Sequence, residues 1–311
     1  MSKTWAILPG ELRLESARGA HVLLTLTALC LAGNYVIARS VHGEIPPLGL
    51  SFWRWTIGAM FLAPFVLPRI RELGAAYRAN LSVLTLLGCM VVGSTSVLFV
   101  ALNFTTALNV SLINAVQPIL TVLLAVVFLK DRITKVRVLG IFSALLGVVI
   151  MLSMGDWAVL AKLQFNVGDL IALGAVLGLA SYALNLRKLP KELSVVESLF
   201  GIIVAGCLML LPFYILESMF YATVPIRAST VFVLIELALL VSVFGNLMWN
   251  LGNQIIGPSR AAIFINLIPL FGAILAVVFL GEKIFIYHLA GGVMICLGVW
   301  LVMGRRLRPE I

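Results

Sequence analysis

Three asparagines, Asn246, Asn250 and Asn253, interrupt one long apolar stretch of the sequence. Their i, i+4, i+7 spacing places the three amides along one face of a helix. An amide both donates and accepts hydrogen bonds, so such a face could bind the polar end of a small solute. The same amides could instead join packed helices, a contribution of ~0.6–2 kcal/mol each inside a membrane. For any single residue both interpretations stay open.

Further polar and aromatic side chains interrupt other apolar stretches. Polar groups inside lipid are costly unless they meet partners or water, so their positions are informative. Taken together, we expect them to line a mostly apolar cavity that suits an aromatic or aliphatic solute with a small polar head. The candidate substrate-binding residues are Asn34, Tyr35, Ser94, Phe99, Asn114, Gln117, Tyr182, Asn185, Asn246, Trp249, Asn250, Phe264 and Asn266.

Two charged residues lie well inside apolar stretches, away from their ends. Glu236 is the one carboxylate well inside a stretch, and intramembrane acids often carry protons in coupled transport. It is therefore a candidate proton-coupling residue, unless it lies close enough to the outer surface to stay wet. We interpret Arg54, between Trp53 and Trp55, as structural, either snorkelling to the interface or bound to backbone carbonyls. A phosphorylated solute would need several such cations, so the sequence argues against one.

Two prolines, Pro118 and Pro269, fall in the middle of apolar stretches at corresponding places. Each removes a hydrogen bond to the carbonyl four residues earlier, which belongs to Asn114 and Ile265 respectively. We expect both to kink their helices and to act as hinges. A static kink that only serves packing is the alternative.

The composition determines which elements hold these residues. The chain has 311 residues, 62% hydrophobic and 11% charged, whereas soluble domains have about 25% charged residues. A helix needs about 20 apolar residues to cross a membrane. The sequence predicts an all-α membrane protein with ten transmembrane helices, at 21–41, 48–68, 81–102, 106–129, 135–154, 169–187, 195–216, 230–251, 258–280 and 286–303.

Lysine and arginine are distributed unequally between the two sides of this arrangement. With the N-terminus inside, 17 of them fall on the cytoplasmic side and 4 on the other. The positive-inside rule therefore predicts cytoplasmic N- and C-termini. The net charge of +9 then has an ordinary explanation, because the basic residues orient the chain in the lipid bilayer and contact its anionic lipids. The charges form short clusters and no basic stripe with aromatic residues, so we expect no nucleic-acid partner.

The sequence repeats itself. AVVFLKDR at 125–132 returns as AVVFLGEK at 276–283, residues 107–151 align with 258–302 without a gap, and LAGNYVIAR (31–39) aligns with LASYALNLR (179–187). Each unit holds five helices, an odd number, so the second copy must cross the membrane in the opposite sense. We therefore predict two inverted five-helix repeats, at 20–154 and 165–304. Inverted repeats are typical of secondary transporters, although a duplication could also merely enlarge a bundle.

These motifs resemble the drug/metabolite transporter superfamily, and within it the EamA type with two five-helix repeats. The resemblance covers about residues 20–304. It rests on the proline-containing fourth and ninth helices, AVVFLKDR and AVVFLGEK, the G-x6-G-V runs after them, GNYVIAR and FWRW. It implies a secondary transporter that exports small metabolites by alternating access across a bacterial inner membrane. Within the family the chain is most similar to exporters of amino acids, in particular aromatic ones.

Other functions stay possible, and the sequence lacks the motifs of several other classes of protein. A drug or other neutral metabolite exporter of the same family, or a channel-like facilitator, remains open as a function. The sequence has no ATP-binding motif and no catalytic cluster such as HExxH, so we expect neither an enzyme nor a cofactor. The cysteines Cys30, Cys89, Cys207 and Cys296 stand singly in apolar runs, so we expect no metal site. Both repeats are in one chain, so a monomer suffices.

Overall fold

The computed structural model describes residues 16–38, 45–131, 133–280 and 283–303, with the backbone alone for 34–38 and 280. All regular elements in these ranges are helical, and no strand occurs in them. In the described part, nine helical stretches are long and apolar enough to cross a membrane, and the apolar helix Ala17–Gly33 is shorter. This confirms the predicted all-α membrane fold, in which α1 (Ala17–Ala38) is the first of the ten expected helices.

Several spans consist of two or three consecutive elements, and short amphipathic helices connect others. In the first half of the chain α1 is followed by α2 (Pro47–Val66), η2 (Leu67–Arg69), α3 (Ile70–Ala79), α4 (Leu81–Gly88), η3 (Cys89–Gly93), α5 (Ser94–Ala101), α6 (Ala107–Ala115), α7 (Gln117–Leu129), α8 (Lys135–Leu152) and α9 (Trp157–Ala161). The second half contains α10 (Val167–Asn185), η4 (Leu186–Lys188), α11 (Val195–Phe220), α12 (Ala228–Glu236), η5 (Leu237–Gly245), α13 (Asn246–Ile256), α14 (Pro258–Ala261), η6 (Ala262–Asn266), α15 (Leu267–Leu280) and α16 (Ile286–Met303).

Local capping residues begin the two long helices of the second half. The Asn166 side chain accepts from the Asp169 backbone at the start of α10, and the Asp169 carboxylate accepts from the Asn166 backbone. Ser194 and Glu197 form the same reciprocal pair at the start of α11. Such capping boxes satisfy backbone N–H groups that have no partner inside the helix. The sequence therefore determines where these two spans begin.

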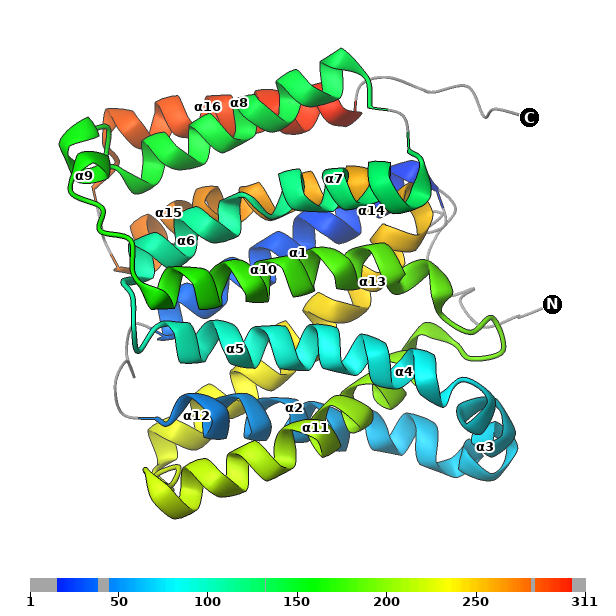
Figure 1. Cartoon of the computed structure of the whole chain (residues 1–311). Coiled ribbons are helices and arrows are strands. Elements are labelled where there is room, and N and C mark those ends of the chain that lie inside the picture. Colours follow the sequence, from blue (N-terminus) through cyan, green and yellow to red (C-terminus); the bar gives the residue numbers. More distant parts are fainter. Residues whose placement is uncertain (1–15, 39–44, 132, 281–282, 304–311) are drawn as a thin grey trace, which may run out of the picture.

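The last spans of the two halves, α8 and α16, lie side by side (Figure 1), and their backbones are in contact. A Cβ atom added at Gly140 would lie 2.8 Å from the carbonyl oxygen of Gly298, and one at Gly147 would lie 2.5 Å from that of Gly291. In the sequence repeat Gly140 aligns with Gly291, and Gly147 aligns with Gly298. Exchanging the two halves therefore maps each contact onto the other. The helices run antiparallel about a pseudo-twofold axis, as inverted repeats require.

Irregular backbone occurs in corresponding spans of the two halves. The third span contains the π-helical segment η3 and the eighth contains η5, and such segments are frequent at functional sites. In the fourth span α6 ends at Ala115, just before Pro118, and in the ninth the 3₁₀ segment η6 ends at Asn266, just before Pro269. The α-helix is thus interrupted beside both prolines, and their role as hinges stays a prediction.

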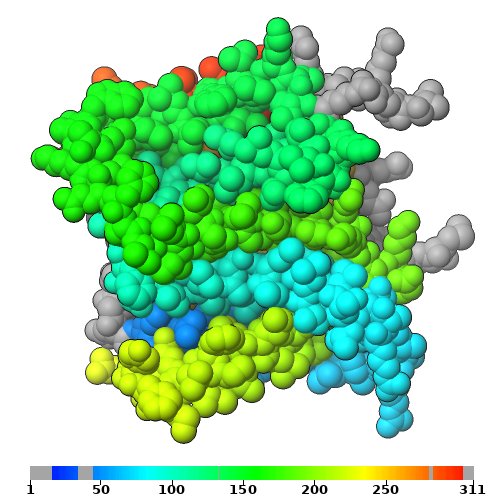
Figure 2. All heavy atoms as spheres, viewed as in Figure 1, coloured from blue at the N-terminus to red at the C-terminus, as the bar shows by residue number. Residues whose placement is uncertain are grey.

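The connections between spans gather at two ends of the bundle (Figure 1), and Figure 2 shows the same face with all atoms, with α3 in cyan at the lower right. The end that carries α3 and the links between α10 and α11 and between α13 and α14 is called the basic end below. Most described lysine and arginine residues lie there, namely Arg18, Arg69, Arg71, Arg78, Lys130, Lys135, Arg137, Arg187, Lys188, Lys191 and Arg260. Lys162, Arg227 and Lys283 lie at the opposite end. By the positive-inside rule the basic end is predicted to be cytoplasmic.

Candidate substrate-binding site

The C-terminal part of α13 carries two asparagines that are almost fully enclosed. Asn250 is 0% exposed and Asn253 is 2% exposed. The Oδ1 atom of Asn250 accepts a 2.8 Å hydrogen bond from the Tyr182 hydroxyl on α10. The Nδ2 groups of both asparagines have no partner among the described residues. An unpaired buried donor costs about 1–3 kcal/mol, so each is a donor that a water molecule or a ligand would satisfy.

The third asparagine of the predicted face has a different environment. The Nδ2 group of Asn246 donates to the Val241 carbonyl, at 2.9 Å, five residues earlier in the chain. That carbonyl belongs to η5, whose i→i+5 bonding differs from the α-helical pattern. Asn246 is therefore bonded to its own helix, and the free donors of this face belong to Asn250 and Asn253.

Two more asparagines lie on the interrupted spans with unpaired polar atoms. Asn266, at the end of η6, is 1% exposed, and neither polar atom of its side chain has a partner within the described ranges. Asn114, near the end of α6, is half-buried, and its Oδ1 atom is likewise buried without a described partner. The fourth and ninth spans thus each bring one such amide close to the break in the helix.

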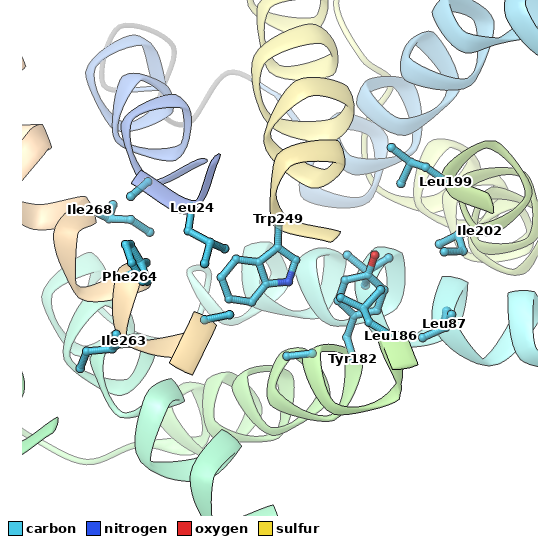
Figure 3. Packing of buried hydrophobic residues seen from close by; sticks show 14 of the residues in the cluster. Leu24, Leu87, Tyr182, Leu186, Leu199, Ile202, Trp249, Ile263, Phe264 and Ile268 are labelled. Atoms are coloured by element: carbon cyan, nitrogen blue, oxygen red, sulfur yellow. The ribbon is translucent and has the colours of Figure 1, made fainter. Parts of the chain in front are cut away.

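An aromatic and aliphatic wall surrounds the amides of α13. Figure 3 shows Trp249 between two groups, with Leu24 and Phe264 on one side and Tyr182 and Leu186 on the other. These five side chains are all buried and belong to one hydrophobic cluster. They come from α1, α10, η4, α13 and η6. Five separate elements therefore meet in the half of the bundle nearer the basic end.

Polar contacts hold the basic end together around this wall. Asp131, just after α7, accepts a 2.7 Å hydrogen bond from the Ser259 hydroxyl on α14. The same carboxylate oxygen lies 3.8 Å from Nη1 of Arg137 on α8. On α1, the His21 ring stacks on Phe264, with ring centroids 5.8 Å apart. The elements of both halves are therefore closed on one another at this end.

The other candidate residues are more scattered. Gln117 is 4% exposed, and Ser94 is buried where α5 packs on Gly178 of α10. Asn185 donates to the Ser181 carbonyl of its own helix at 2.8 Å and lies 3.9 Å from the Met90 sulfur. The side chains of the two remaining candidates lie outside the described residues, namely Asn34 and Tyr35.

Arg54 on α2 differs from its interpretation from the sequence. It is 2% exposed, so it does not snorkel to a surface. Its Nη2 atom donates to the Thr95 hydroxyl at 3.2 Å, and no backbone carbonyl of the described residues accepts from it. The guanidinium carbon lies 4.7 Å from the Trp55 ring centroid and 5.4 Å from that of Phe99. Sequence reasoning missed this environment, although the single arginine in an aromatic stretch was the available signal.

Glu236, the last residue of α12, has both carboxylate oxygens buried without a partner in the described part of the chain. The residue as a whole is half-buried. Because the oxygens themselves are covered, the alternative in which Glu236 stays wet at the outer surface is disfavoured.

The two described pockets lie away from these residues. One, of about 420 Å³, is at the end opposite the basic end and is lined by Thr106, Leu108, Asn109, Val159, Lys162, Leu163, Gln164 and Asn166. The other, of about 220 Å³, is an apolar recess between α2 and α11. Neither is lined by a candidate residue, so the expected central cavity stays a prediction. The wall around Trp249 is packed shut in this conformation.

An antiparallel pair of repeat-related helices, interrupted spans and buried amide atoms without a described partner are features typical of membrane transporters. Comparison with known proteins agrees. The EamA-like transporter family matches residues 18–153 and, a second time, residues 166–304. The chain therefore belongs to the EamA-like transporter family, a family of transporters and not of enzymes, and it is a multi-pass membrane protein.

Individual relatives are similar over nearly the whole chain. It is 27% identical to the uncharacterized transporter YyaM of Bacillus subtilis over 290 residues, 91% of this chain and 93% of that one. It is 28% identical to a probable terminal-alkyne amino-acid exporter of Streptantibioticus cattleyicolor over 294 residues, 91% and 93% of the two chains. One solved crystal structure superposes with a TM-score of 0.72 at 19% identity, covering 92% of this chain and 96% of that one, which supports the fold alone.

Proposed function

We propose that the protein is a secondary transporter that exports amino acids with aromatic or hydrophobic side chains by alternating access across a bacterial inner membrane. The observation that carries this proposal is a group of buried amides beside the wall of Trp249 and Phe264. The Nδ2 groups of Asn250 and Asn253 and both polar atoms of Asn266 have no partner among the described residues. The free Nδ2 donors suit the carboxylate of an amino acid, the free Oδ1 acceptor of Asn266 suits its ammonium, and the aromatic rings suit its side chain. The relative named as an amino-acid exporter supports the same class.

Alternating access gives the closed basic end a role in the cycle. With that end cytoplasmic, the described conformation is closed to the cytoplasm, and loading requires Trp249 to part from Leu24 and Phe264. The breaks beside Pro118 and Pro269 are where the fourth and ninth spans would bend. One chain carries both halves, so the transporting unit is proposed to be a monomer.

Glu236 supports a second feature, coupling to protons. Its buried carboxylate oxygens have no partner among the described residues, and acids inside a membrane often carry protons in coupled transporters. If export is proton-coupled, Glu236→Gln abolishes the effect of an imposed pH gradient while leaving downhill exchange of substrate. Transport that responds to the gradient equally in both proteins removes this residue from the coupling.

The test of the function is flux into proteoliposomes of the purified protein. Labelled Phe, Trp, Met and Thr and a sugar phosphate are offered, each with and without a pH gradient. Saturable flux of Phe and Trp, with competition by unlabelled Phe and accelerated counterflow, is the expected result. Flux without counterflow would indicate a channel-like facilitator, and flux of the sugar phosphate alone would contradict the amino acid proposal.

A further inference from the structure

Arg54 is a buried cation for which the described residues provide no anion. It lies within α2, 2% exposed, and no carboxylate of the described residues forms an ion pair with it. Its Nε atom is buried without a hydrogen-bond partner in those residues. Removing a charge from water is costly unless it is paired, and pairing usually accounts for buried arginine. An unpaired one therefore calls for a ligand.

The buried carboxylates near the ends of α2 are occupied elsewhere. Glu217 on α11 accepts from the backbone N–H groups of Leu48 and Gly49, at 3.0 and 2.6 Å. At the other end, Glu197 accepts from Nη1 of Arg69 at 2.9 Å. Both acids hold α2 against α11 at its ends, so neither is available to neutralise a guanidinium in its middle.

The surroundings hold the guanidinium in a fixed position. The Thr95 hydroxyl accepts from Nη2 of Arg54 at 3.2 Å and from Nε1 of Trp55 at 3.3 Å, and it donates to the Val91 carbonyl at 2.7 Å. One turn before Arg54, a 2.6 Å hydrogen bond between Ser51 and Ser96 fixes α2 against α5. Thr95 is thus fully used as a positioning residue, and the guanidinium is presented in one orientation.

The free donors define the chemistry of the ligand. A guanidinium is a planar fork of five N–H donors that matches a carboxylate in a bidentate pair. One such group balances a single negative charge, which suits a carboxylate and not a phosphate. Phe99, which lies over the guanidinium on α5, is half-buried and was itself a candidate substrate residue. Its ring covers the cation by a cation–π contact when no anion is present.

We propose that Arg54 binds the carboxylate of the transported solute. In this proposal Thr95 orients the guanidinium, and the Phe99 ring moves aside to admit the carboxylate. The inference rests on the proposed function, since it assigns the carboxylate end of the same amino acid substrate. The amides near Trp249 then bind the solute on the part of its path nearer the basic end. In an alternating-access cycle the solute meets these amides first and Arg54 afterwards.

The test compares three related ligands on the wild-type protein in detergent. Phenylalanine has both charged groups, 3-phenylpropionate lacks the ammonium, and phenethylamine lacks the carboxylate. Binding is measured by thermal stabilisation and by competition with labelled phenylalanine. We expect phenylalanine and 3-phenylpropionate to bind and phenethylamine to bind at least about tenfold more weakly. Equal binding of phenethylamine overturns the inference without any mutation, and so does failure of every carboxylate in the panel to bind.

Two variants of Arg54 and one control variant then locate the effect. Arg54→Gln is expected to weaken phenylalanine binding roughly 30-fold or more and to abolish the preference over phenethylamine, whereas Arg54→Lys keeps part of it. Arg71→Gln, on exposed α3, is the matched control and leaves binding unchanged. Without ligand, Arg54→Gln should unfold at the same or a higher temperature than wild type, because an unpaired charge is removed. A merely structural arginine would give a lower unfolding temperature and leave ligand preference intact.

The outcomes separate this inference from the proposed function. Export of phenylalanine that Arg54→Gln leaves unchanged refutes the role of Arg54 and keeps the amino acid proposal. Binding of 3-phenylpropionate that depends on Arg54, with no binding or transport of any amino acid, keeps the carboxylate site and refutes that proposal.

Discussion

The hydrogen bond between Tyr182 and Asn250 allows a sharp test of whether the buried amides bind a solute or only join helices. Tyr182→Phe removes the single donor that satisfies Oδ1 of Asn250, and the Nδ2 of that amide is already without a described partner. The variant thus leaves a fully buried amide with no hydrogen bond from a described residue. Since an unsatisfied buried group costs about 1–3 kcal/mol, the free energy of unfolding should fall by that amount.

The second step removes the amide as well. In Tyr182→Phe/Asn250→Leu both polar partners are replaced by apolar groups, which is close to neutral or stabilising. We expect the double variant to regain a free energy of unfolding within about 1 kcal/mol of the wild-type value, while substrate export is lost. The four proteins of this cycle are unfolded with SDS in mild detergent, and the same preparations are assayed for flux in proteoliposomes.

A tyrosine outside the candidate site serves as the control. The Tyr214 hydroxyl accepts a 3.0 Å hydrogen bond from Nε1 of Trp53, between α11 and α2. Tyr214→Phe should lower the free energy of unfolding, because Trp53 loses its acceptor, and should leave the apparent affinity for substrate unaltered. Wild-type export by Tyr182→Phe/Asn250→Leu would show that the amide only joins helices. A double variant as unstable as Tyr182→Phe would refute the reasoning about unpaired donors.

Three further predictions concern the framework. Glu217→Gln should lower the free energy of unfolding by roughly 1.5–3 kcal/mol, because a carboxylate bonded to two N–H groups of α2 is lost. In the same SDS titration Glu192→Gln, at an exposed residue, should change the free energy of unfolding by no more than about 0.5 kcal/mol. Gly147→Ala should lower the free energy of unfolding by about 1–3 kcal/mol, because the added Cβ meets the α16 backbone. Gly174→Ala, where nothing lies within 4 Å of the added Cβ, should not lower the free energy of unfolding. Equal effects of the two variants would contradict the close crossing. Pro118→Ala should slow the maximal rate of export in proteoliposomes, and unchanged kinetics would reject a hinge there.

The sequence by itself determined the class of fold, because hydrophobicity and length suffice for it. A long apolar run can satisfy its backbone in lipid only as a helix, so α1 and the nine spans found among the described residues follow from composition. The repeat also predicts the inversion, since an odd number of helices in each unit reverses the second copy. The close crossing of α8 and α16 at Gly140 and Gly298, and at Gly147 and Gly291, was not predicted and comes from the structure.

Only the tertiary structure decided which polar residues are free to bind. Asn246 and Asn250 are alike in sequence, but one bonds to the π-helical backbone and the other faces Tyr182 with its Nδ2 unpaired in the described region. Arg54 was expected to reach an interface or backbone carbonyls, and it is instead enclosed by Thr95 and two aromatic rings. Spacing determines the helical face on which a side chain lies. Its partners belong to other helices, whose approach depends on packing across the whole bundle.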